Sequence, residues 1–301
     1  MNHFLCVRDS SAEELDELLT LSAELKRRDK QGTLPRILGG KVLAMIFEKA
    51  SLRTRMSFEI AMTDLGGSGI TLKPEDIGIL GQREPIKDVA RVIGRYVHGI
   101  MCRTFSHQTL KELAEHAGVP VINALSDWSH PCQAMADVLT IREHLGALAG
   151  KKIAFIGDGN NVARSLAFVT AKFDMTMAIA SPAGYELDGE THRRVNRDRP
   201  CLSLHSDPVE AVTGADVVYT DTWVSMGQEE ETRRRVADFA GFQVNAELLS
   251  HAPDAKIMHC LPAHRGYEIT DDVAESANSV IFDQAENRLH FQRALLAKLL
   301  G

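Results

Sequence analysis

The sequence lacks any run of about 18 apolar residues, the length that a membrane-spanning helix needs. Its first residues, MNHFLCVRDSS, lack the basic start and the long apolar stretch of a signal peptide. Its five cysteines lie far apart with no CxxC pair, which is typical of reduced thiols in a cytoplasmic protein. These absences lead us to expect a cytoplasmic protein that does not enter a membrane.

The chain also lacks an excess of positive charge, since its formal net charge is -7. General nucleic-acid binding normally shows as a basic balance, so we expect no nucleic-acid partner. A small anionic substrate needs only a local cluster of positive charge and stays compatible with this balance. The 301 residues, 44% of them hydrophobic, suffice for two globular domains with separate cores.

Strand-like apolar runs alternate with helical patterns along the chain. The runs are KVLAMIF (41–47), HGIMCRTF (98–105), VPVINAL (119–125), KKIAFIG (151–157), MTMAIAS (175–181), ADVVYTD (215–221), AKIMHCL (255–261) and SVIFD (279–283). This alternation predicts the α/β class, with two domains that each contain a parallel sheet flanked by helices. A long helix over 129–145 is expected to join them. We therefore expect one domain over 1–132, a second over 133–284, and a C-terminal helix over 285–301 that packs back on the first.

Polar residues follow several of these runs. In parallel sheets ligands bind beyond the carboxyl ends of the strands, so we expect these residues to gather in one cleft. In FEKASLRTR (47–55), Ser51 is a candidate cap of a helix whose free N–H groups and dipole favour an anion, and Arg53 adds a planar donor fork. A plain capped helix, with Arg55 in a structural ion pair, explains the same residues. The residues alone leave both interpretations open.

Two further stretches each allow a chemical and a structural interpretation. In IGDGNNVARS (156–165), Val162 occupies the third glycine position of a dinucleotide turn and no acid ends the next strand, which disfavours a nicotinamide site. Asn160 and Asn161 remain candidates either to cap a helix or to hold a carboxylate. In DTWVSMG (221–227), the acid after the strand either binds an ammonium group or belongs to an ordinary turn.

MHCLPAHRG (258–266) contains two histidines and one cysteine. Their spacing is a poor match to a zinc site. Cys260 is either a nucleophile or, more commonly for this residue type, a small buried apolar side chain. Pro262 is a candidate for a cis peptide bond.

Seven ordered stretches resemble the aspartate/ornithine carbamoyltransferase family over nearly the whole chain: FEKASLRTR, MCRTF, HPCQ, GDGNN, DTWVSMG, HCLPAHRG and FDQAENR. DTWVSMG together with HCLP resembles the ornithine branch more than the aspartate branch. The resemblance implies transfer of the carbamoyl group of carbamoyl phosphate to the side-chain amine of L-ornithine, as in arginine biosynthesis. It also implies a homotrimer with shared active sites, and a reaction that needs no metal, cofactor or covalent enzyme intermediate.

The resemblance further implies roles for individual residues. Ser51, Leu52, Arg53 and Thr54 would cradle the phosphate, and Arg103 would bridge it to the carbonyl oxygen. His130 and Gln133 would hold the carbamoyl group, with Cys260, Leu261 and Arg288 around the reacting centre. Asn161, Asp221, Ser225 and Met226 would bind ornithine. The catalytic groups among these would be Thr54, Arg103, His130 and Cys260.

The chain departs from the family's usual FEKPSTRTR at Ala50 and Leu52, and it has Ile79 where ornithine enzymes often have a glutamine, with Gln82 close by. Leu52 costs little if only its backbone N–H binds phosphate, and it lowers affinity if a hydroxyl is needed. The alternatives are a carbamoyltransferase for putrescine or an N-acylated ornithine, and a non-catalytic relative. Asp221 favours a free α-amino group, because an acylated nitrogen carries no charge to pair with it.

Overall fold

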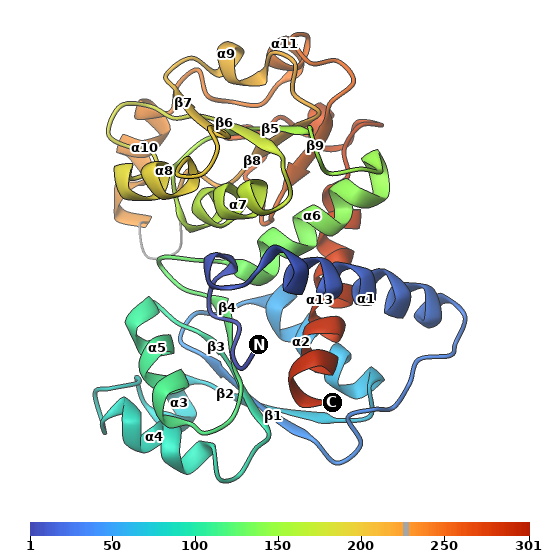
Figure 1. Cartoon of the computed structure of the whole chain (residues 1–301). Helices are drawn as coiled ribbons and strands as arrows, with labels where there is room; N and C mark the ends of the chain where they lie inside the picture. Colours follow the sequence, from blue (N-terminus) through green and yellow to red (C-terminus); the bar gives the residue numbers. More distant parts are fainter. Residues whose placement is uncertain (225–228) are drawn as a thin grey trace. The chain divides into compact units, whose positions relative to one another are not determined.

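The structure, a computed structural model, describes residues 1–224 and 229–301 (Figure 1). The chain forms two compact units, a first unit of Met1–Leu139 with Glu286–Gly301 and a second unit of Thr140–Ala285. The division falls inside helix α6 (Pro131–Leu145) and inside the C-terminal helix α13 (Ile281–Leu300). Each unit contains one parallel sheet with helices around it, so the predicted α/β class is confirmed.

The first unit is built on a four-stranded sheet in the order β2-β1-β3-β4. Its strands are β1 (Val42–Phe47), β2 (Ser68–Leu72), β3 (Gly99–Arg103) and β4 (Val121–Leu125). All three pairings are parallel, and Phe47 at the end of β1 lies opposite Arg103 at the end of β3. The two strands therefore release the chain at the same edge of the sheet.

Helices cover both faces of this sheet. They are η1 (Val7–Asp9), α1 (Ala12–Lys30), α2 (Leu52–Asp64), α3 (Pro74–Ile77), α4 (Ile86–Ile93) and α5 (His107–His116), together with the end of α13. Alternate residues of β1, Ala44 and Ile46, pack with Ala90 of α4 in one apolar cluster. On the other face α13 approaches β3 so closely that a Cβ added to Gly99 would lie 2.8 Å from a methyl of Leu300. Figure 1 accordingly shows α4 and α5 on one side of the sheet and α13 on the other.

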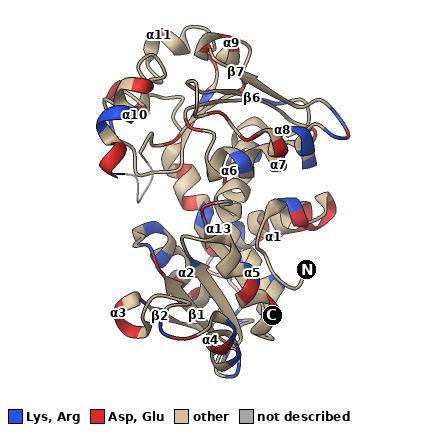
Figure 2. Ribbon diagram, turned by 90° about the vertical axis from the view of Figure 1, so that its left-hand side faces the viewer, with Lys and Arg blue, Asp and Glu red and all other residues tan. Residues whose placement is uncertain are grey.

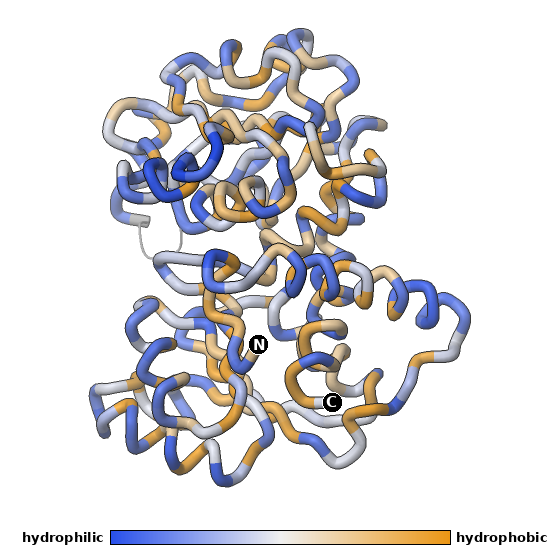
Figure 3. Tube along the Cα trace, viewed as in Figure 1, coloured by the Kyte–Doolittle hydropathy of each residue, from blue (hydrophilic) through white to orange (hydrophobic). Residues whose placement is uncertain are grey.

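Helix α1 illustrates how the apolar pattern selects a buried face. Ser11 caps it and exchanges hydrogen bonds with Glu14 in a capping box. Leu15, Leu18 and Leu19 are fully buried at helical spacing, while the charged residues between them face solvent. In Figure 3 the helix accordingly alternates between hydrophilic and hydrophobic colours.

The second unit is built on a five-stranded parallel sheet in the order β7-β6-β5-β8-β9. Its strands are β5 (Lys152–Ile156), β6 (Thr176–Ala180), β7 (Leu202–His205), β8 (Val217–Thr220) and β9 (Lys256–His259). The helices are α7 (Asn161–Lys172), α8 (Gly189–Val195), α9 (Pro208–Val212), η2 (Glu229–Glu231), α10 (Thr232–Asp238), α11 (Ala246–Leu249) and α12 (Asp271–Ala274). Trp223 and Phe239 stack with ring centroids 5.5 Å apart in the core of this unit.

One predicted strand is wrong. The run SVIFD (279–283) makes only an isolated bridge at Ser279, and α13 already begins at Ile281. A short apolar run does not distinguish a strand from the buried start of a helix, which accounts for the error. Among the described residues, the structure has no helix with the length and apolar character that a membrane crossing demands.

Candidate active site

The start of α2 combines the two interpretations of FEKASLRTR. Ser51 is the N-cap and its hydroxyl accepts a hydrogen bond from the Thr54 N–H at 3.4 Å. Arg55 forms an exposed ion pair with Glu59 at 2.9 Å, as the structural interpretation expected. The Leu52 side chain is 74% exposed, so it packs against little of its own chain. What this stretch offers a ligand is therefore the helix start itself, with Arg53 on its first turn.

Arg288, from α13, connects the far end of the chain to this helix start. Its Nη2 donates a hydrogen bond of 2.7 Å to the hydroxyl of Thr54. Both side chains are buried, Thr54 completely and Arg288 to 3% exposure. A buried guanidinium is stable only where hydrogen-bond acceptors or an anion surround it, and the Thr54 hydroxyl is one such acceptor.

His130 lies immediately before α6 and is 4% exposed. Burial, and then the positive charges of Arg288 and Arg103, lower the pKa of His130 well below its usual value of 6.5. Charges act in this way only over short distances, so His130, Arg103 and Arg288 share one neighbourhood in the first unit. Its imidazole is therefore neutral at pH 7, with one N–H to donate.

Gln133 lies on the first turn of α6 and is 1% exposed. Its amide nitrogen donates to the carboxylate of Asp137 at 2.8 Å. This contact orients the amide, and the opposite atom, Oε1, has no hydrogen-bond partner within the described part of the chain. Gln133 thus presents a buried acceptor. Burial raises the pKa of the thiol of its neighbour Cys132 to about 12. Cys132 therefore stays a protonated, unreactive side chain that packs in the core.

In the second unit, three adjacent strands deliver one hydrogen-bonded set around Asp221. Asn160 follows β5, Asp221 follows β8 and Cys260 follows β9. The thiol of Cys260 donates to Asp221 Oδ1 at 2.8 Å, and Asn160 Nδ2 donates to Asp221 Oδ2 at 2.8 Å. The carboxylate is 6% exposed, which makes it a nearly buried negative charge.

Of the two asparagines of GDGNN, the structure shows Asn160 as the helix cap. Asn160 caps α7 by accepting from Val162 N at 2.9 Å, and the same side chain reaches Asp221. Asn161, the residue expected to hold ornithine, is the first residue of α7 and is half-buried. Two other expected ornithine ligands, Ser225 and Met226, lie outside the described residues. Sequence reasoning gave Asn160 no role beside Asp221.

The sequence also did not predict a buried pair next to Cys260, formed by His259 and Glu268. His259 Nε2 contacts Glu268 Oε1 at 3.0 Å, and His259 Nδ1 accepts from the Leu261 N–H at 2.9 Å. The Leu261–Pro262 bond is cis, as its sequence suggested, and Leu261 has φ 57. His259 and Glu268 thereby hold the backbone on both sides of Cys260. Nothing in RGYEIT marks Glu268 as a buried acid.

Asp221, His259 and Cys260 each place a potential metal-ligand atom within 4.8 Å of the others. Both ring nitrogens of His259 already have partners, and the Cys260 thiol donates to Asp221. A metal ion would have to replace these hydrogen bonds, so we interpret the three residues as members of two separate contacts, Cys260 with Asp221 and His259 with Glu268.

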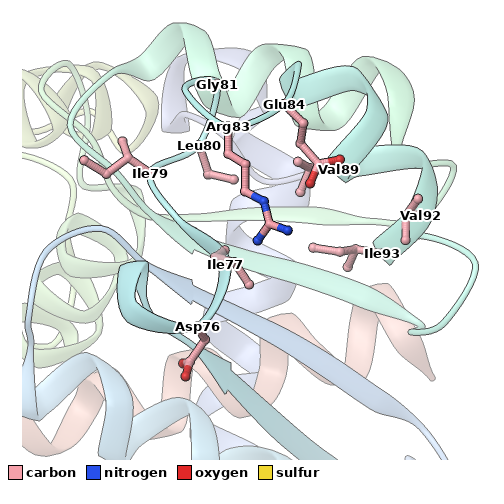
Figure 4. Close-up of a pocket in the computed structure, with 10 residues that line it drawn as sticks. All are labelled: Asp76, Ile77, Ile79, Leu80, Gly81, Arg83, Glu84, Val89, Val92 and Ile93. Atoms are coloured by element: carbon pink, nitrogen blue, oxygen red, sulfur yellow. The ribbon is translucent and has the colours of Figure 1, made fainter.

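A cavity of about 230 Å³ lies elsewhere in the first unit, beside α3 and α4 (Figure 4). Ile79, Leu80 and Ile93 give it an apolar wall, and Arg83 reaches into it. Ile79, which stands where the family often has glutamine, belongs to this wall, whereas none of the expected donor residues does.

The family follows from comparison with known proteins. The model of the aspartate/ornithine carbamoyltransferase carbamoyl-P binding domain matches residues 2–143, and the model of the family's Asp/Orn binding domain matches residues 149–299. This chain belongs to the aspartate/ornithine carbamoyltransferase family. The set around Asp221 lies within the second match, and Thr54, Arg103 and His130 lie within the first, while their partner Arg288 falls in the range of the second.

Named relatives within the family match over nearly full length. An ornithine carbamoyltransferase from Carboxydothermus hydrogenoformans is 53% identical and covers 99% of this chain and 97% of its own. One from Methanocorpusculum labreanum is 50% identical, with 99% and 97% covered. The solved structure of ornithine carbamoyltransferase from Pyrococcus furiosus superposes with a TM-score of 0.97 at 49% identity, covering 100% of this chain and 97% of that one.

Proposed function

We propose that this chain transfers the carbamoyl group of carbamoyl phosphate to the side-chain amine of L-ornithine, giving citrulline and phosphate. Relatives of that name, about half identical over nearly the full length, support this function. The observation that carries it chemically is the buried cationic set of the first unit, in which Arg288 contacts Thr54 and both Arg288 and Arg103 act on a neutral His130.

Residues 1–132, with the C-terminal helix 285–301, form the carbamoyl phosphate-binding domain in this proposal. The phosphate binds at the start of α2, where Ser51, Arg53 and Thr54 supply N–H groups, hydroxyls and a guanidinium. Leu52 contributes its backbone N–H, because its exposed side chain carries no donor. Arg288 completes the cradle through Thr54.

The reaction needs donors for an oxygen that gains negative charge. The neutral amine attacks the carbamoyl carbon, the carbonyl oxygen becomes an oxyanion, and Arg103, His130 and Thr54 donate to it. Removing one such donor typically costs about 100- to 1000-fold in rate. Gln133 accepts from the carbamoyl NH₂ through its Oε1, to which no described residue donates a hydrogen bond. The phosphate then leaves and takes the proton that the amine must lose.

Residues 133–284 form the ornithine-binding domain in this proposal. Asp221 pairs with the α-amino group, while Asn161, Ser225 and Met226 bind the rest of the amino-acid end. Cys260 and Leu261 line the reacting centre. The thiol of Cys260 donates a hydrogen bond to Asp221. It thereby stabilises the carboxylate that pairs with the α-amino group of ornithine.

We further propose a homotrimer in the cytoplasm. Leu52, Met56 and Ile60 fall on one face of α2 and are between 37% and 74% exposed, a stripe that a second copy of the chain would cover. The five cysteines are free thiols, as in a reducing compartment. A sedimentation mass of one 33.1 kDa chain would contradict the trimer.

A substrate panel tests the function. Purified protein is incubated with carbamoyl phosphate and ornithine, acetylornithine, putrescine or aspartate, and the carbamoylated product is measured. Citrulline formation at a rate far above that with the other amines is expected. Preference for putrescine or acetylornithine would move the chain to another branch, and no turnover with any amine would favour a non-catalytic relative.

A further inference from the structure

Arg235 of α10 is a buried arginine that the reaction does not use. It is 6% exposed, although it stands in the charged sequence TRRRVAD. Figure 2 shows both signs of charge on α10, and its neighbour Arg234 is an exposed member, with a side chain 63% exposed. Burying a guanidinium is costly unless its donors are paired, so the contacts of Arg235 indicate what it holds.

Arg235 ties three segments of the second unit together. Its Nη1 donates to Asp158 Oδ2 at 2.8 Å and to the Trp223 carbonyl at 3.0 Å. Its Nε donates to Glu231 Oε2 at 3.0 Å, and its guanidinium carbon lies 4.9 Å from the ring centre of Tyr185. The planar fork of arginine makes these contacts at once, which the single ammonium of lysine does not reproduce.

Two of these contacts flank the bridge between Asn160 and Asp221. Asp158 lies two residues before Asn160, and its carbonyl accepts from the Asn160 N–H at 2.7 Å. Trp223 lies two residues after Asp221. The intervening Gly159 fits tightly, since a Cβ there would lie 2.2 Å from Leu187 N. Arg235 therefore fixes the two turns from which Asn160 and Asp221 project.

The electrostatics of Asp158 agree with this arrangement. Burial raises the pKa of Asp158, while the hydrogen bond and the charge of Arg235 act in the opposite direction. Without the guanidinium, the Asp158 carboxylate would have to take up a proton or water, and the Trp223 carbonyl would lose a donor. Both responses displace the turns that carry the Asp221 set.

We propose that Arg235 is a positioning residue for ornithine: by joining Asp158 to the Trp223 backbone, it holds Asp221 and Asn160 in the arrangement that receives the amino-acid end of the substrate. This inference rests on the proposed function. It assigns Arg235 no contact with the substrate.

The test is Arg235→Gln, with Arg234→Gln as the matched control on the same helix. In the citrulline assay, the KM for ornithine of Arg235→Gln should rise between about tenfold and a hundredfold, as when a hydrogen bond between a charged group and the substrate is lost. Its KM for carbamoyl phosphate should stay within about twofold, because that set lies in the other unit. Both KM values of Arg234→Gln should stay within about twofold, as for surface substitutions generally.

A second variant keeps the test decisive if Arg235→Gln does not fold. Asp158→Asn keeps the size of the side chain and removes the charge that Arg235 meets, so it should raise the KM for ornithine in the same direction. If both variants fold, the double variant should be no worse than Arg235→Gln, because both substitutions remove the same contact between Arg235 and Asp158.

An unchanged KM for ornithine in the folded variants, or an equal rise in both KM values, would overturn the positioning role. Wild-type turnover in the same assay tests the proposed function separately. If the wild type is active and Arg235→Gln has the same KM for ornithine, the positioning role is wrong and the proposed function stands.

Discussion

The two hydrogen-bonded sets differ in the sign of their charge. The set in the first unit joins guanidiniums and a neutral imidazole around a helix start, with Arg288 on Thr54. The set in the second unit is centred on one carboxylate, Asp221, which accepts from Asn160 and Cys260. Under the proposed function, the same α/β architecture provides one site for an anion and another for an ammonium group. Fold alone does not determine this difference; the particular side chains in each set do.

The largest effect is expected from a substitution that removes charge from the first set. Arg103→Met should lower kcat by about 100- to 1000-fold, because a donor to the developing oxyanion is lost. The KM for carbamoyl phosphate should rise more than the KM for ornithine. Steady-state kinetics with each substrate varied in turn measure both. Arg55→Gln, which breaks only the exposed pair with Glu59, is the control and should keep near wild-type activity.

The second-largest effect is expected from a substitution that removes charge from the set around Asp221. Asp221→Asn should raise the KM for ornithine by about 10- to 100-fold, since a hydrogen bond to a charged group contributes about 1.5–3 kcal/mol. The KM for carbamoyl phosphate should change little. Asp216→Asn is the control: it removes the same charge just before β8, where the carboxylate pairs with Lys151 at 2.9 Å. Equal rises in both KM values for Asp221→Asn would contradict the assignment of ornithine to the set around Asp221.

A third, smaller effect concerns stability and pH. The folded-state pKa of His130 lies below its unfolded value of 6.5, so the unfolded chain binds the extra proton first as the pH falls. The stability that neutral His130 contributes is complete above pH 6.5 and declines below it, by up to about 1.4 kcal/mol per pH unit. His130→Gln should therefore lose less unfolding free energy between pH 7.5 and 5.5 than the wild type.

Urea unfolding at both pH values measures this difference. His251→Gln removes an exposed histidine and should keep the wild-type pH dependence. An identical loss in His130→Gln and the wild type would mean that burial and the cationic neighbours do not hold His130 neutral.

The smallest effect tests the departure at the helix start. Leu52→Thr restores the family's hydroxyl at a position whose side chain is 74% exposed. If only the backbone N–H binds phosphate, the KM for carbamoyl phosphate should stay within about twofold, because the substitution leaves that N–H in place. A several-fold fall in that KM would assign the hydroxyl a part in binding.

The sequence predicted the strands whose apolar runs are long, such as β1 and β5. It also predicted that several motif residues follow the ends of strands. It missed β2 and β7, because SGITL and LSLH are short, partly polar edge strands without a clear period. It did not distinguish buried Arg235 from exposed Arg234, since their local sequence is alike. Roles such as those of Arg235 and Glu268 depend on partners distant in the sequence, which only the packed structure brings near.

The most direct measurement is the set of four KM values, for carbamoyl phosphate and for ornithine, in Arg103→Met and Asp221→Asn. We expect a crossed pattern: Arg103→Met weakens mainly the binding of carbamoyl phosphate, and Asp221→Asn weakens mainly the binding of ornithine. Parallel changes for both substrates in both variants would contradict it.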